Sequence, residues 1–383
     1  FLPRITVQGA ERLTGEADAA RILDGLYRRH LFTHRRPGDV PTFQYHNLFE
    51  LFLKTRARAV IDPEDLATLV TRCGEILEDE GLSDEAFERY REAGAAAALV
   101  RLATGHAERL LAQGRGATLR AWIEAIPHDV AAREPRLAYW VGMSLIPERP
   151  ETARGILEAA HAGLRAAGRH RDAVLAACGV IEAMYREWSG FLAIPGWLVR
   201  IEELFDDDDA IDTSAAELRI CSTLILAMTY AQPGHPRLPE LAIRVQTLLR
   251  ANEIGVGVRL VAGTYLLTWC SLALRIDAGR QVIALVEPLL AHPDAAPAAV
   301  VWWHARTGFF EFVAESPAAG LARLELARAI GEAHGLVADE GARVVFHHYR
   351  LLLAMACDDA STARRALADV GAAAWRERPM DRW

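Results

Sequence analysis

The chain has 383 residues, of which 51% are hydrophobic and 25% are charged, so it is a folded protein and not a disordered one. This length is too great for one compact core and suits two or three domains or one extended array of repeats. The formal net charge is -8 and there is no long basic run, which argues against a surface that grips nucleic-acid phosphates by itself.

The five cysteines are widely separated and no CxxC pair occurs, so the sequence predicts buried free thiols and neither a disulfide framework nor a zinc site. No signal peptide or run of about eighteen apolar residues is present. We therefore expect a cytoplasmic protein with no membrane contact. The chain starts at Phe1 without an initiator methionine, and we expect it to be a piece of a longer protein.

Residues 1–58 are predicted to form a small first domain. Val7, Ala10 and Leu13 indicate a short helix that ends at Gly15, and a second helix follows with one apolar face from Ala20 to Tyr27. Two β-prone runs, 31–34 and 42–45, flank the sequence Arg-Arg-Pro-Gly-Asp, which has the composition of a turn. The order helix, helix, hairpin, helix is that of a winged-helix domain without its leading helix.

The stretch 43–53 passes from a β-prone run through His46 into an amphipathic helix. Two interpretations remain open at this point. The junction is either a buried connection between strand and helix, or a place where the histidine has a function of its own.

From residue 62 to the end the pattern predicts only helices, and we assign 62–383 to a second domain. Four helices are expected before residue 127, the third of them interrupted at Gly105. Further helices are predicted at 135–146, 150–167, 170–188, 193–205, 213–231, 238–251, 257–276, 278–291, 296–315, 317–334, 340–357 and 360–374.

The later helices alternate between one with large side chains and one rich in alanine, and equivalent aromatic residues recur at roughly the forty-residue period of helical-pair repeats. This pattern predicts an α-solenoid of tetratricopeptide-like helical pairs, in which the small alanine side chains let the inner helix of each pair approach its neighbours closely.

An aromatic series runs along the predicted solenoid, and it has two interpretations. These rings either fill the layers between helices or line a candidate effector pocket on the concave face, where rigid aromatic residues bind small molecules. Arg120, Arg186 and Arg259 are plausible partners for an anionic effector, although nothing in the sequence selects them. The candidate residues are Tyr139, Trp140, Tyr185, Trp188, Tyr265 and Trp269.

No metal site and no catalytic constellation can be read from the sequence, and we do not expect an enzyme. His304 and His347 would be the first metal ligands to test, but a metal centre needs three or four converging ligands. The acidic run Asp206–Asp209 lacks the alternating spacing of a calcium loop and is interpreted as a solvated loop.

The first domain resembles the winged helix of MalT-type regulators, which are bacterial LuxR-family transcriptional activators of the STAND class of signalling NTPases. The resemblance is carried by Leu2–Thr6, Leu26–Phe32 and Tyr45–Phe49, and it extends over about residues 1–160 through segments such as Gly114–Ile123. It implies an ATP-binding module before the winged helix, a tetratricopeptide-like sensor after it, and a helix-turn-helix at the end.

The same resemblance implies one nucleotide-sensing residue. In STAND proteins a winged-helix histidine at the junction between strand and helix contacts the phosphates of ADP, and His46 is the matching position, followed here by Asn47 where relatives have aspartate. No GxxxxGK[ST] motif occurs, so ATP or ADP would bind only in the full-length protein. DNA would likewise be contacted only through a missing C-terminal domain.

The leading hypothesis is therefore the effector-sensing and self-association region of a STAND-class activator, which would bind a small molecule or a protein on the superhelix. One alternative is a tetratricopeptide-like scaffold for protein–protein interaction, without NTPase or DNA-binding parts. The other is a helical enzyme that uses the concave groove.

Overall fold

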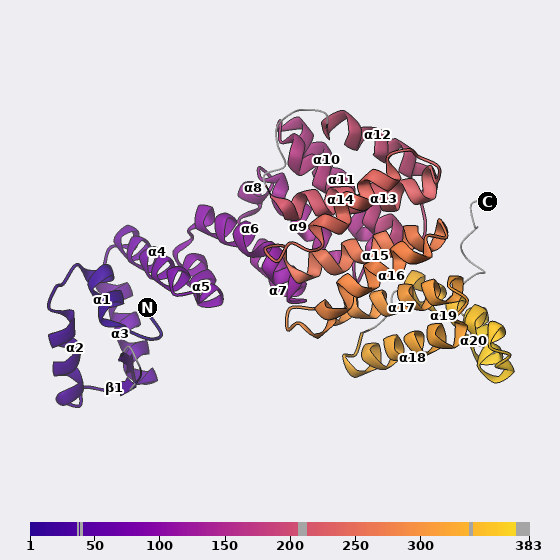
Figure 1. The fold of residues 1–383 in the computed structure, drawn as a ribbon. Coiled ribbons are helices and arrows are strands. Elements are labelled where there is room, and N and C mark those ends of the chain that lie inside the picture. Colours follow the sequence, from indigo (N-terminus) through magenta and orange to yellow (C-terminus); the bar gives the residue numbers. More distant parts are fainter. Residues whose placement is uncertain (37, 39–40, 206–212, 337–339, 373–383) are drawn as a thin grey trace. The chain divides into compact units, whose positions relative to one another are not determined.

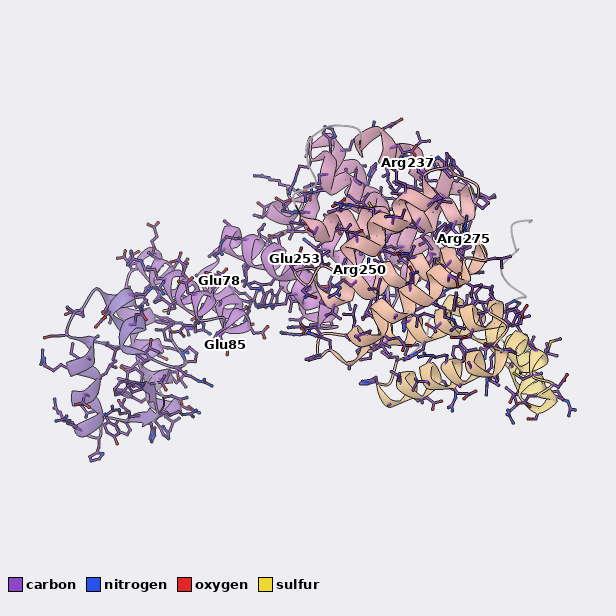
Figure 2. The ribbon with its side chains drawn as sticks, in the orientation of Figure 1. Glu78, Glu85, Arg237, Arg250, Glu253 and Arg275 are labelled. Atoms are coloured by element: carbon purple, nitrogen blue, oxygen red, sulfur yellow. The ribbon has the colours of Figure 1, made fainter. Side chains whose placement is uncertain are left out.

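The computed structural model describes residues 1–36, 38, 41–205, 213–336 and 340–372 (Figure 1). The chain forms two compact units, one made of residues 1–106 and 121–133, the other of residues 107–120 and 134–383. Charged side chains such as Arg237, Arg250 and Arg275 project from the surface of the second unit (Figure 2). Across the described residues, no helix has both the length and the apolar character that crossing a membrane requires.

The first unit begins with the predicted helix, helix, hairpin, helix order. Thr6 accepts a hydrogen bond from the backbone N–H of Gly9 and so starts the first helix, and Gly15 ends it in a left-handed conformation. The strands are antiparallel, with Thr33 opposite Tyr45, and Ile5 makes a single bridge to Phe43. The elements are α1 (Val7–Thr14), α2 (Ala19–Arg28), β1 (Thr33–Arg36), β2 (Thr42–Tyr45) and α3 (Asn47–Val60). The winged-helix arrangement is confirmed.

Two details of this region differ from the prediction. Strand β1 starts at Thr33 and not at residue 31, because His30 and Phe32 both have positive φ angles and the chain turns there. The junction around His46 is not a buried connection, since Leu48 and Phe52 on α3 are 73% and 61% exposed. The expected Pro-Gly-Asp turn lies largely outside the described residues.

The rest of the first unit is helical, and its first two helices pack at close range. The elements are α4 (Pro63–Asp79) and α5 (Ser83–Ala93), with part of α6 (Ala96–Ala112), part of α7 (Gly116–Glu124) and the short α8 (His128–Ala131). A Cβ at Gly74 would lie 2.5 Å from the ring of Tyr90, so only glycine allows α4 and α5 to approach this closely. Helix α6 runs through Gly105 without the predicted interruption.

The second unit is a helical solenoid built from pairs of consecutive helices (Figure 1). The pairs are α9 (Pro135–Leu145) with α10 (Pro150–Ala166), α11 (His170–Glu187) with α12 (Ile194–Phe205), α13 (Ser214–Ala231) with α14 (Leu238–Leu248), α15 (Val256–Leu272) with α16 (Ile276–Val286), α17 (Pro297–Val313) with α18 (Pro317–Ala333), and α19 (Glu340–Ala356) with α20 (Ala360–Ala372). Two short 3-10 turns, η1 (Phe191–Ala193) and η2 (Glu287–Ala291), join the series.

The odd-numbered helices form a continuous inner row. Each of α9, α11, α13, α15 and α17 packs against the next odd-numbered helix, and α11 also contacts α19 directly. The row therefore curves until helices near its two ends meet. These are the helices with large side chains, so the expectation that the alanine-rich helix of each pair is the inner one is wrong. The aromatic side chains need the larger space that is shared between successive inner helices.

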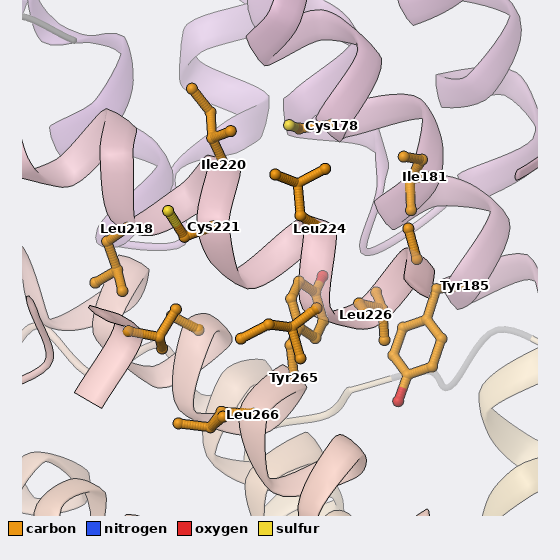
Figure 3. Close-up of a cluster of buried hydrophobic side chains, with 14 of the residues drawn as sticks. Cys178, Ile181, Tyr185, Leu218, Ile220, Cys221, Leu224, Leu226, Tyr265 and Leu266 are labelled. Atoms are coloured by element: carbon orange, nitrogen blue, oxygen red, sulfur yellow. The ribbon is translucent and has the colours of Figure 1, made fainter. Parts of the chain in front are cut away.

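The core of this unit is concentrated between the inner helices. Cys178, Leu224 and Leu266 come from α11, α13 and α15 and are almost fully buried (Figure 3). Four of the five cysteines are buried free thiols and Cys357 is partly buried.

Helix α15 ends at Leu272 and not at residue 276, because Leu274 has a φ angle of 53°.

Candidate functional site

Aromatic side chains from the inner row meet around Tyr185 on α11. The ring centroid of Tyr185 lies 5.7 Å from that of Tyr265 and 6.3 Å from that of Trp302. Trp188 and Tyr230 are also within 6.0 Å of it and of each other. Figure 3 shows Tyr185 and Tyr265 directed into the space between their helices. Such ring pairs add stability beyond the area that they bury.

Arg306 on α17 lies in the middle of these rings and is only 2% exposed. Its Cζ atom is 4.9 Å from the ring centroid of Tyr185, 5.4 Å from that of Tyr349, 5.5 Å from that of Trp302 and 5.7 Å from that of Trp188. A guanidinium over aromatic faces at these distances is held by cation–π attraction. We call this set the Arg306 cluster; it consists of Arg306, Tyr185, Trp188, Tyr230, Tyr265, Trp302 and Tyr349.

The guanidinium of Arg306 is surrounded by phenol groups and has no carboxylate partner among the described residues. Burial alone would lower its pKa, but Tyr185, Tyr349 and Tyr230 act in the other direction and the pKa is raised. No carboxylate among the described residues forms an ion pair with it. Burial raises the pKa of Tyr349 to about 12, so this phenol is neutral at physiological pH. Arg306 is therefore a permanent buried cation.

The cluster reaches the surface and carries a second cation at its edge. Trp188, Tyr230 and Trp302 are half-buried, whereas Tyr185 and Arg306 lie beneath them. The Cζ atom of Arg186 is 4.3 Å from the ring centroid of Trp302. Two guanidinium groups, those of Arg186 and Arg306, thus share one indole ring.

The structure brings together three of the six predicted pocket residues. Tyr185, Trp188 and Tyr265 belong to the Arg306 cluster. Tyr139 and Trp140 on α9 contact each other, with their ring centroids 4.8 Å apart. Trp269 is buried in the same core but is not part of the Arg306 cluster. That these residues bind an effector remains a prediction.

Arg306, the cation at the centre of the cluster, was not singled out by the sequence. Arg120 instead pairs with Glu148, and Arg259 donates to the backbone oxygen of Leu249. Of the three named arginines, only Arg186 touches the cluster. The sequence does contain a pattern that could have pointed to Arg306. Trp302 and Tyr349 occupy successive helices with large side chains, about one repeat apart, and Arg306 lies one helical turn after Trp302.

His46 is the N-cap residue of α3. Its Nδ1 atom accepts a hydrogen bond from the backbone N–H of Leu48 at 3.4 Å, and its side chain is exposed. Because Nδ1 is the acceptor, the proton of the neutral imidazole is on Nε2, where it can be donated outward. The geometry is compatible with a contact to phosphate, and the nucleotide-sensing role remains a prediction.

The described residues contain no group of three or more metal-binding side chains placed to share an ion. His304 is 4% exposed and burial lowers its pKa, while the Nδ1 atom of His347 lies 3.5 Å from a carboxylate oxygen of Asp369. The acidic run Asp206–Asp209 lies outside the described residues.

The architecture defines a class of protein in which a winged helix is followed in sequence by a helical solenoid. Residues 1–66 match the MalT winged helix domain family, and the N-terminal part of the chain is a domain of this type. Over 136 residues the chain is 30% identical to the HTH-type transcriptional regulator MalT of Yersinia pestis (strain Pestoides F) and of Yersinia pseudotuberculosis (serotype O:1b, strain IP 31758). The matched region covers 35% of this chain and 15% of each relative.

Proposed function

We propose that this chain is the effector-sensing and self-association region of a STAND-class, ATP-dependent transcriptional activator of the LuxR family. In this proposal the second unit is a tetratricopeptide-like sensor that binds a small molecule or a protein effector in the cytoplasm. ATP or ADP would bind an NTPase module, and DNA a helix-turn-helix, both outside these residues. This region would catalyse no reaction itself.

The observation that carries the proposal is the Arg306 cluster in the solenoid. Its side chains come from α11, α13, α15, α17 and α19, so one ligand there would contact five helices of the inner row at once. A ligand shifts a conformational equilibrium only if it binds one state more tightly than the other. Contacts to so many helices make the affinity depend on the curvature of the row, which is the property a sensor needs.

A second observation supports coupling to an adjacent module. Leu48, Leu51 and Phe52 lie on one face of α3 and are 73%, 60% and 61% exposed. Exposed apolar faces of this kind are used for contacts between proteins or domains. In our proposal this face packs against the NTPase module of the same regulator, next to His46, and transmits the state of the bound nucleotide.

A reporter assay of the longer regulator tests the sensing role. Trp302→Ala and Trp188→Ala remove rings of the Arg306 cluster that are half-buried, so the fold should be retained. We expect both variants to lose the effector-dependent increase in transcription. Trp140→Ala, a half-buried tryptophan outside the cluster, is the matched control and should respond normally.

Equal responses of all three variants would exclude the cluster as the sensor. If only a protein partner stabilised the chain and no small molecule did, the scaffold function would replace the sensing function. A native reading frame with no P-loop upstream of Phe1 would contradict the activator as a whole.

A further inference from the structure

Two nitrogen atoms of the Arg306 guanidinium, Nε and Nη2, have no acceptor among the described residues. Nη1 donates to the phenol oxygen of Tyr349, whereas Nε and Nη2 are buried and make no hydrogen bond of normal geometry to a described residue. The hydroxyl of Tyr185 interacts electrostatically with the guanidinium, but no hydrogen bond of normal geometry joins the two. A buried polar group that makes no hydrogen bond is costly, and the cost is larger for a charged group. Native proteins rarely keep such a group without a use for it.

The two donors have a geometry that selects their acceptor. Nε and Nη2 lie on one planar edge of the guanidinium, and their N–H bonds are parallel. This fork matches the paired oxygen atoms of a carboxylate or a phosphate. A neutral hydroxyl or amide oxygen can satisfy only one of the two donors well.

The rings around Arg306 restrict the ligand further. The faces of Tyr185, Trp302 and Tyr349 are turned toward the guanidinium, with centroids 4.9 to 5.5 Å from Cζ. A flat molecule that meets the Nε–Nη2 edge would have aromatic surface against its body. A negative charge bound at this edge would be attracted by the buried guanidinium of Arg306.

We infer that the Arg306 cluster binds a small molecule with a carboxylate or phosphate group, held by Nε and Nη2 of Arg306 and stacked on the neighbouring rings. The inference rests on the proposed sensing function and specifies the chemical class of the effector. Carboxylate and phosphate can both present a pair of oxygen atoms to one edge of a guanidinium, so the shared chemistry is that of an oxyanion attached to a flat apolar body.

Three probes of similar size test this inference on the purified chain. Benzoate and phenyl phosphate carry the two oxyanions, and benzamide has the shape of benzoate without its charge. We expect a saturable rise in melting temperature and saturable quenching of tryptophan fluorescence with at least one of the two anions, and neither effect with benzamide. Benzoate alone would identify a carboxylate ligand, and phenyl phosphate alone a phosphate ester.

Substitutions localise the binding. Arg306→Met should abolish it, and Arg306→Lys, which keeps the charge but loses the fork, should weaken it at least tenfold. Arg280→Met is the matched control, because Arg280 also lies over an aromatic ring, that of Phe310, but forms an ion pair with Glu311. If Arg306→Met does not fold, the comparison of benzoate with benzamide on the unaltered chain still decides the question.

Binding of benzamide as tightly as benzoate, binding of neither anion, or equal anion affinity in Arg306→Lys and the unaltered chain would overturn the inference. These results are separate from the reporter assay of the longer regulator. A regulator that responds to a neutral effector through Trp302 would retain the sensing function and lose only its anionic specificity.

Discussion

Glu182 on α11 and Arg219 on α13 form an ion pair between two helices of the inner row, and the Glu182 side of the pair is buried. The Nη2 atom of Arg219 lies 2.6 Å from Oε2 and 2.8 Å from Oε1 of Glu182, and the side chains are 21% and 6% exposed. Tyr139 and Tyr265 are close enough to interact electrostatically with this pair. Unlike Arg306, therefore, Arg219 has a carboxylate of its own.

Arg219→Met should strongly destabilise the second unit. The substitution leaves the carboxylate of Glu182 buried without its partner, and we expect a loss of about 3–5 kcal/mol of unfolding free energy in urea titrations. Arg328→Met removes exposed pairs with Glu325 and Glu332 and should cost at most about 1 kcal/mol. Similar losses in the two variants would contradict the buried role of the Glu182–Arg219 pair.

Gly320→Ala should destabilise the contact between α17 and α18. A Cβ at Gly320 would lie 2.6 Å from the backbone oxygen of Gly308 and 2.6 Å from a methyl group of Leu353, so the helices must separate, at a cost of about 1–3 kcal/mol. Gly331→Ala on the same helix meets only Val301, at 4.0 Å, and should stabilise by up to about 1 kcal/mol. Thermal unfolding of both variants measures the difference, and a stable Gly320→Ala would show that the two helices are not in close contact.

The stability of the chain should fall as the pH rises above about 8.5, the ordinary pKa of a thiol. Burial raises the pKa of Cys178 and Cys270 to about 12 and that of Cys221 to about 11. Because the folded-state pKa is the higher one, the stabilisation is complete below the unfolded pKa and is lost as the pH rises through the window up to the folded value.

Urea titrations between pH 8 and 10 measure this loss, which approaches about 1.4 kcal/mol per pH unit for each buried thiol. Cys178→Ala and Cys270→Ala should each make the dependence shallower. Iodoacetamide should modify Cys357 first, since it is the only one of the five that is not fully buried. A stability that does not change between pH 8 and 10 would contradict the burial of these thiols.

His46→Asp separates the two roles of this residue. Aspartate is a good N-cap acceptor, so α3 should still begin at the same residue. The unfolding free energy of the first unit should stay within about 0.5 kcal/mol of that of the unaltered chain. The donor to phosphate is lost and a negative charge replaces it. We expect the longer regulator to lose bound ADP faster and to activate transcription without effector.

His46→Ala is the companion variant, because it removes both the donor and the cap and should also cost about 1 kcal/mol. His30→Asp, at an exposed position outside the junction, is the control. Unchanged ADP retention in His46→Asp would leave this histidine with only its structural role.

Helix positions could be predicted from the sequence because proline, glycine and capping residues mark most ends locally. Asp62 and Pro63 start α4, and Gly94 ends α5, as the pattern indicated. The errors arise where the determinant is not local. No pattern around Leu274 announces a left-handed residue, and nothing along α3 shows that Leu48 and Phe52 face outward.

In the candidate site, too, the residues with a local sequence signal were predicted and the residue that depends on the tertiary structure was not. Tyr185, Trp188 and Tyr265 could be found because aromatic residues are conspicuous in a helical pattern. Arg306 could not be found, because its significance comes from the curvature that brings α11, α17 and α19 together. One arginine among many gains a role only through the rings that surround it in three dimensions.

The contact between α11 and α19 changes how this array is expected to unfold. Linear repeat proteins have interactions only between neighbours, so their terminal repeats fray independently of the rest. Here the last helical pair is also attached to a helix far earlier in the chain. Loss of α19 would remove Tyr349 from Arg306 and weaken the packing of α11 as well, so the terminal pair is thermodynamically linked to the centre of the unit. A cut in the chain before α19 would therefore be felt at Tyr185, more than one hundred and fifty residues away in sequence.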